Sequence, residues 1–152
     1  MNNLYSILNN YVLITASISW FTAGVLKVII DFIVMKRVSL TRVVGSGGMP
    51  SSHTSTVVAL TIASGYFSGV SSTEFAISVI LAIIVIHDAV GVRQETGKQA
   101  ELLNHMMFDT SLFNDIDFEK RLKEYVGHTP FQVAVGAIVG IIVSTICINI
   151  FR

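Results

Sequence analysis

Two histidines, each within or at the end of a short polar segment, are the residues of this chain best suited to chemistry. His53 closes the run GSGGMPSSH, residues 45–53, and His128 lies in GHTP, residues 127–130. A neutral imidazole can attack an electrophile, and a second imidazole that titrates near neutrality can donate a proton at working pH. Both histidines are therefore candidates for chemistry.

Both histidines stand beside a predicted helix start that suits an anion. Pro50 followed by Ser51 and Ser52 indicates a helix with a serine cap, and Thr129 followed by Pro130 indicates a second start. A helix N-terminus offers free N–H donors and partial positive charge, so it binds phosphate without a metal. Glycines in the preceding turn can direct further N–H groups toward the same anion, namely Gly45, Gly47 and Gly48.

Composition indicates that these residues work in a membrane. Of 152 residues, 52% are hydrophobic and 13% charged, and the mean hydropathy is +0.68. Sheet edges cannot be satisfied in lipid, which favours helices. We predict a single membrane-embedded domain over residues 1–152: an all-α integral membrane helical bundle of about four transmembrane helices. The predicted spans are 11–35, 54–70, 75–90 and 131–151.

The composition also argues against nucleic-acid partners and against a disulfide within the chain. Zero net charge gives no general attraction to nucleic acid, so no nucleic-acid partner is expected. One cysteine, Cys147, excludes a disulfide within the chain.

Alternation of the predicted helices brings three polar segments to one membrane face. Residues 45–54 precede the second helix, residues 88–93 end the third, and residues 127–130 begin the fourth. Most basic residues fall on that face: Lys36, Arg37, Arg42, Arg93, Lys98, Lys120, Arg121 and Lys123. The positive-inside rule therefore predicts a cytoplasmic active site in a bacterial plasma membrane, with both termini outside.

The polar segment 91–127 is too long for a structureless connection. Apolar side chains at helical spacing predict two short interfacial helices between the third and fourth spans, over 96–108 and 118–126. The residues that mark these faces are Ala100, Leu103 and Met107, then Phe118, Leu122 and Tyr125.

These motifs resemble those of the type 2 phosphatidic acid phosphatase superfamily, the lipid phosphate phosphatases, whose fold vanadium haloperoxidases share. The run PSSH at 50–53 resembles the superfamily's Pro-Ser-Gly-His motif. Together with DAVGVR at 88–93, GKQA at 97–100, GHTP at 127–130, and Gly136 and Gly140, it resembles the small bacterial and plant divergent branch. The resemblance covers residues 27–140.

The resemblance implies a phosphatase that hydrolyses a lipid or isoprenoid phosphate or pyrophosphate through a phosphohistidine, with no cofactor or metal. It makes His128 the nucleophile and His53 the general acid. The residues expected to hold the phosphoryl oxygens are Lys27, Arg93 and Lys98, with the turn and helix start at Gly47, Gly48, Ser51 and Ser52.

The chain departs from the superfamily's first two motifs. At the spacing from Lys27 where the first motif has Arg-Pro, this chain has Val34 and Met35. In the second motif Ser52 replaces glycine, which narrows backbone freedom and adds a hydroxyl.

The third motif differs from the superfamily's at the residue expected to partner the nucleophilic histidine. Gln132 stands where an aspartate is expected, and no arginine precedes His128 at the usual offset. The carboxylate would fix the imidazole tautomer and stabilise the imidazolium. We expect Asp88 to substitute as a third catalytic residue and Arg93 to replace the arginine.

Two other functions compete with hydrolysis. A non-catalytic membrane protein could keep the phosphate-binding turn to bind anionic lipid or support assembly. Alternatively, carboxylates such as Asp88 and Glu95 could hold Mg²⁺ for phosphoryl transfer.

Some of these residues also have purely structural interpretations. Lys27 could pair with Asp31, one turn along the same helix. Gly136 and Gly140 have the spacing that permits close helix packing, or a homodimer face.

Overall fold

The chain forms an all-α membrane helical bundle. The computed structural model describes residues 2–36, 48–109, 121–122 and 128–152, and within these ranges no strand occurs. The helices are α1 (Asn2–Leu8), α2 (Tyr11–Met35), α3 (Ser52–Phe67), α4 (Thr73–Val90), α5 (Val92–Asn104), the short π-helix η2 (His105–Asp109) and α6 (Pro130–Phe151).

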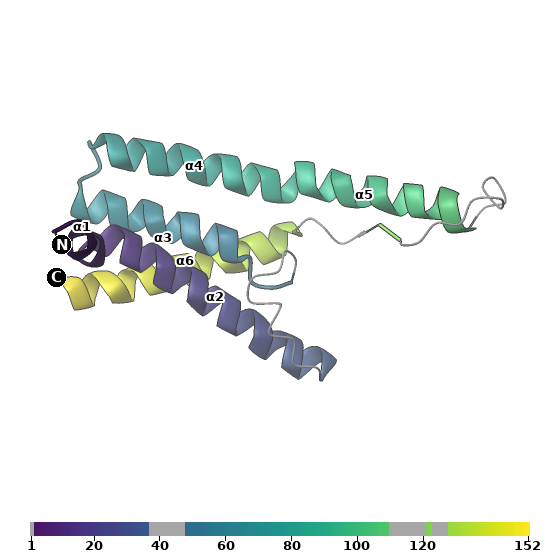
Figure 1. The fold of residues 1–152 in the computed structure, drawn as a ribbon, viewed down its shortest axis with the longest axis horizontal. Helices are drawn as coiled ribbons and strands as arrows, with labels where there is room; N and C mark the ends of the chain where they lie inside the picture. The colour runs from purple at the N-terminus through teal and green to yellow at the C-terminus, as the bar shows by residue number, and fades with distance from the viewer. Residues whose placement is uncertain (1, 37–47, 110–120, 123–127) are drawn as a thin grey trace.

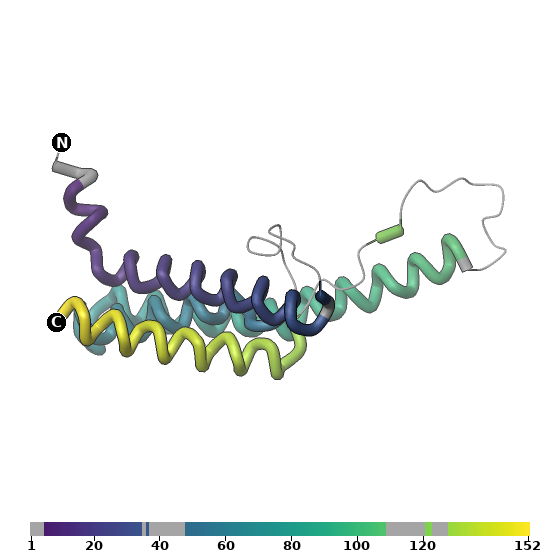
Figure 2. The backbone as a smooth tube through the Cα atoms, turned by 90° about the horizontal axis from the view of Figure 1, so that it is seen from below, coloured from purple at the N-terminus to yellow at the C-terminus, as the bar shows by residue number. Residues whose placement is uncertain are grey.

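Helix α3 occupies the centre of the bundle and contacts α2, α4 and α6 (Figure 1). Both chain termini lie at one end of the bundle, as Figures 1 and 2 show. The starts of α3 and α6 and the end of α4 lie together at the opposite end. The described parts of the three polar segments, residues 48–54, 88–93 and 128–130, therefore lie at one end of the bundle, as predicted.

Among the described residues, three helical segments are long and apolar enough to cross a membrane: Tyr11–Val34, Thr73–Phe108 and Pro130–Phe151. They make the chain an integral membrane protein. The fourth predicted span, 54–70, corresponds to α3, which has 16 residues and is shorter than the roughly 20 that a full crossing needs.

The helix starts follow from side-chain caps. Asn10 precedes α2 and accepts a hydrogen bond from the Leu13 N–H at 3.0 Å. Ser72 precedes α4 and accepts one from the Phe75 N–H at 3.1 Å. Each cap satisfies a backbone donor that has no partner within its helix.

Small and hydroxylated side chains let α3 sit among three neighbours. Its buried residues are Ser52, Thr54, Ser55, Val57, Ala59, Ala63 and Ser64. Such residues allow membrane helices to approach closely and bond across the interface. The Ser19 and Ser55 hydroxyl oxygens are 2.7 Å apart, linking α2 to α3. The Thr61 hydroxyl donates to the Ser78 carbonyl at 3.1 Å, linking α3 to α4.

Helix α6 approaches α3 through two glycines. A Cβ added to Gly136 would lie 2.6 Å from the Ser51 carbonyl oxygen, and one added to Gly140 would lie 2.6 Å from that of Ser55. Both distances are shorter than van der Waals contact. The small-residue face of α6 therefore packs against α3 of the same chain.

The helix predicted over 96–108 is present as α5 and η2, and it continues directly from α4. Gly91 is the cap residue between α4 and α5. Backbone hydrogen bonding continues through it, because its N–H donates to the His87 carbonyl at 2.9 Å and its carbonyl accepts from the Glu95 N–H at 3.0 Å. The helix predicted over 118–126 lies outside the described residues except at Arg121 and Leu122.

We expect Gly136→Val to destabilise the bundle by roughly 1–3 kcal/mol, because the added methyl groups would meet backbone that cannot move aside. Ala134→Val is the matched control, since Ala134 is exposed on the same helix. Thermal unfolding in detergent micelles measures both. Equal midpoints for the two variants would contradict the close α3–α6 contact.

Candidate active site

The two motif histidines line one cavity of about 170 Å³ at the polar end of the bundle. His53 comes from the first turn of α3, and His128 precedes α6. Asp88 near the end of α4 and Arg93 at the start of α5 line the same cavity. Four polar side chains that are far apart in the sequence therefore share one space.

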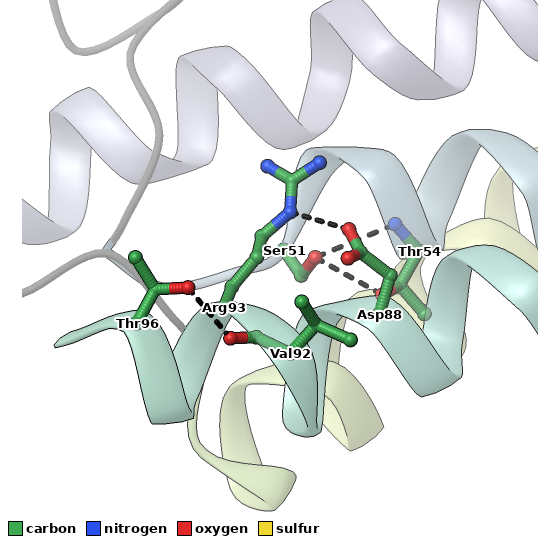
Figure 3. Close-up of polar contacts among 6 residues, drawn as sticks. All are labelled: Ser51, Thr54, Asp88, Val92, Arg93 and Thr96. Atoms are coloured by element: carbon green, nitrogen blue, oxygen red, sulfur yellow. Dashed lines mark hydrogen bonds and ion pairs between the residues drawn. The ribbon is translucent and has the colours of Figure 1, made fainter. Parts of the chain in front are cut away.

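The first helix start is built by Ser51. Its hydroxyl oxygen accepts hydrogen bonds from the Thr54 N–H at 3.4 Å and from the Thr54 hydroxyl at 3.0 Å (Figure 3). Because it accepts from the Thr54 N–H, the Ser51 hydroxyl caps α3, as predicted for a serine at this start, and the residue is fully buried. Before it, Gly48 has a φ of 85°, a left-handed conformation that favours glycine. Gly47 and Gly45 lie outside the described residues.

Lys27 approaches the same helix start from α2. Its side chain is only 1% exposed, and its ammonium donates to the Ser52 hydroxyl at 3.5 Å. A buried lysine at this position brings a cation to the N-terminus of α3. Ser52, which stands where the resembled motif has glycine, therefore has Lys27 as a hydrogen-bond partner.

The second helix start fixes His128. Thr129 and Gln132 form a reciprocal capping box, and Pro130 occupies the first turn, as the sequence predicts for Thr129 and Pro130. The His128 N–H donates to the Ala89 carbonyl at 3.1 Å, which ties the segment to α4. The imidazole Nδ1 lies 3.1 Å from the Gln132 Oε1, and the residue is 4% exposed.

Gln132 is a site residue that sequence analysis treated only as a departure from the motif. The Thr-x-x-Gln spacing of a capping box was the available signal. A capping box predicts where the amide points along the backbone. It does not reveal that His128 is hydrogen-bonded to the same Gln132 oxygen as the Thr129 N–H.

Asp88 and Arg93 form an ion pair through the Arg93 Nε and the Asp88 Oδ2. Figure 3 shows the two terminal guanidinium nitrogens of Arg93 directed away from that carboxylate. Arg93 lines the cavity that holds both histidines. Asp88, expected to support His128, instead hydrogen-bonds Arg93, and the Nδ1 of His128 is occupied by Gln132.

Lys98 lies apart from this group. Its ammonium pairs with the Glu95 carboxylate at 2.6 Å, and both side chains are more than 60% exposed. It does not line the cavity that holds the histidines.

Burial lowers the pKa of the His128 imidazole below its usual value of 6.5. The hydrogen bond to Gln132 opposes this shift, while the charges of Lys27, His53 and Arg93 lower the pKa further. The neutral imidazole, which is the nucleophilic form, is therefore favoured at neutral pH.

A metal-ligand cluster is not found among the described residues, where no three His, Cys, Asp or Glu side chains gather closely enough to hold an ion. Asp88 and Glu95 are each paired with a basic side chain instead.

The chain is thus an all-α membrane bundle in which two imidazoles and an arginine line one cavity. A family model described as "Divergent PAP2 family" matches residues 8–143, and the chain belongs to that family.

A curated relative supports the same assignment. The chain is 36% identical over 155 residues to a Bacillus subtilis (strain 168) protein described as "Uncharacterized membrane protein YuiD". The match covers 95% of this chain and 98% of that protein. No solved structure matches the chain significantly.

We expect His128 to titrate below pH 6.5 in the folded protein, because burial and neighbouring cations disfavour its charged form. NMR of ¹⁵N-histidine-labelled protein in micelles measures the midpoint, and loss of the signal in His128→Asn assigns it. A midpoint at or above 6.5 would contradict the buried, cation-flanked environment.

Proposed function

We propose that this protein is a metal-independent membrane phosphatase that hydrolyses a lipid or isoprenoid phosphate or pyrophosphate. The observation that carries the proposal is the placement of His53 and His128, from two separate helix starts, on one cavity with Arg93. Two imidazoles and a guanidinium on one small space can supply a nucleophile, an acid and an oxyanion partner to a single phosphoryl group.

In the first step, the Nε2 lone pair of His128 attacks phosphorus and forms a P–N bond. The bond from phosphorus to the leaving-group oxygen breaks, and protonated His53 gives that oxygen its proton. The products are a phosphohistidine on His128, the released alcohol or phosphate, and a neutral His53.

In the second step, neutral His53 takes a proton from water as the water oxygen attacks phosphorus. The P–N bond breaks, inorganic phosphate leaves, and the Nε2 lone pair of His128 is restored. His53 is protonated again, so each turnover consumes one water and returns both imidazoles to their starting forms.

Positive charge beside the cavity suits the phosphoryl oxygens. Arg93 binds Asp88 through Nε, which leaves its terminal nitrogens directed elsewhere for a bidentate contact. Lys27 brings a second cation to the start of α3, close enough to act on the charge of His128. Both would stabilise the charge that develops during phosphoryl transfer.

An amphiphilic substrate fits the position of this cavity. Ile84 and Val85, one turn before Asp88 on α4, add an apolar wall beside the polar groups. Ile84 and its neighbour Ile83 are more than half exposed along a helix of membrane-spanning length. The phosphate would rest among the basic side chains while its hydrocarbon tail stays in lipid.

We expect His128→Ala to lower phosphate release by at least about 10³-fold, since it removes the nucleophile, and His53→Ala by about 10²–10⁴-fold, since it removes the acid. Phosphate release from phosphatidic acid and from isoprenoid pyrophosphate in mixed micelles measures both variants. His105→Ala, a histidine away from the cavity, is the matched control.

Three results separate this proposal from its rivals. Full activity in both cavity variants would contradict the two-histidine mechanism. Binding of anionic lipid without turnover, retained in both variants, would select the non-catalytic function. Loss of activity with a chelator and recovery with Mg²⁺ would select the metal-dependent alternative.

The basic residues predict that the cavity end faces the cytoplasm and that both termini lie outside. An alkaline phosphatase fusion at Arg152 should therefore be active in cells, whereas a fusion after Asn104 should be inactive. The reverse pattern would place the cavity on the outer face.

A further inference from the structure

Gln132 is held so that its amide can be oriented without ambiguity. Its Oε1 faces the backbone N–H of Thr129 at 3.2 Å, and a backbone N–H can only donate. The atom facing Thr129 must therefore be the amide oxygen. The Nδ1 of His128 lies 3.1 Å from that same oxygen.

An oxygen acceptor dictates where the imidazole carries its proton. Because the Gln132 Oε1 can only accept, the Nδ1 of neutral His128 must be protonated to bond it. The Nε2 then holds the lone pair.

The backbone of Gln132 is fixed as well. Its carbonyl accepts from the Ser51 N–H at 3.2 Å, and its N–H donates to the Thr129 hydroxyl at 3.3 Å. The residue that orients His128 is thus bonded to the start of α3, the helix whose first turn carries His53.

We propose that Gln132 is the positioning residue for His128, replacing the expected aspartate with a neutral acceptor that selects the Nδ1–H tautomer and leaves Nε2 free to attack. This inference rests on the proposed function for its catalytic consequence. The tautomer itself is independent of activity.

A neutral acceptor has a consequence that a carboxylate would not. An amide selects the tautomer but adds no negative charge, so it stabilises the imidazolium less than aspartate does. The nucleophile therefore stays neutral to lower pH than it would beside a carboxylate. Replacement by glutamate keeps both accepted hydrogen bonds and adds the charge.

The test combines ¹⁵N-histidine NMR with kinetics on the full-length protein in micelles. In the wild type we expect the Nδ1–H tautomer at His128. Gln132→Ala should shift His128 toward Nε2–H and lower kcat about 10- to 100-fold. Gln132→Glu should keep the Nδ1–H tautomer, retain activity, and move the acid limb of the kcat/KM profile to higher pH.

Thr129→Ala is the matched control, because it breaks the other half of the capping box and leaves the Gln132 amide in place. It should keep the Nδ1–H tautomer and the wild-type pH profile. If Gln132 acts only as a cap, Thr129→Ala and Gln132→Ala will lose activity equally, and the proposal fails. A wild-type Nε2–H tautomer, or unchanged tautomer and kcat in Gln132→Ala, would also overturn it.

Failure of the proposed function gives a different result. The wild type would then release no phosphate from any lipid phosphate while His128 still carried its proton on Nδ1. In that case a tautomer shift in Gln132→Ala would still support the positioning role, and no shift would reject it.

Discussion

The close approach of α6 to α3 is the constraint on which the rest of the site depends. The Ser51 carbonyl lies where a side chain at Gly136 would have to be, and the Ser51 N–H donates to the Gln132 carbonyl. These contacts place the N-termini of α3 and α6 side by side. Because His53 lies two residues after Ser51 and His128 lies four before Gln132, the same contact sets the separation of both imidazoles. Wider helix spacing would leave two unrelated histidines at a membrane surface.

That geometry places positive charge on and beside the cavity. The two helix starts contribute partial positive charge, and Lys27 and Arg93 add full charges from α2 and α5. The only acidic side chain that lines the cavity within the described ranges, Asp88, is used to hold Arg93. Gln132 contributes an acceptor without a charge. The cavity therefore combines an imidazole whose pKa is lowered with cationic groups on and beside its lining, a combination that favours the proposed phosphorylated ligand.

The bundle supports this site by dividing two tasks among its helices. Helix α3 is short, and its buried side chains are mostly small or hydroxylated. It can therefore pack among three neighbours and carry polar residues at its start. The longer apolar segments, Tyr11–Val34, Thr73–Phe108 and Pro130–Phe151, have the length to cover the membrane distance. Large aliphatic side chains on α4, such as Ile77 and Ile83, remain exposed, as expected for a surface that meets lipid. The polar end and the apolar flank of the cavity follow from this division.

The sequence by itself determined the features that depend on near neighbours in the chain. Hydropathy placed α2 at Tyr11–Met35, and local cap signals placed one helix start at Ser51 or Ser52 and the other at Thr129. Topology then brought the three polar segments to one end. Only the tertiary structure decided which side chains meet there. Lys98 pairs with Glu95 outside the cavity, Asp88 accepts a hydrogen bond from Arg93, and Gln132 is hydrogen-bonded to the His128 imidazole. Helix periodicity and caps are short-range and appear in the chain itself. Partner choice depends on helix rotation and spacing to within a few ångströms, and both are set by packing between distant segments.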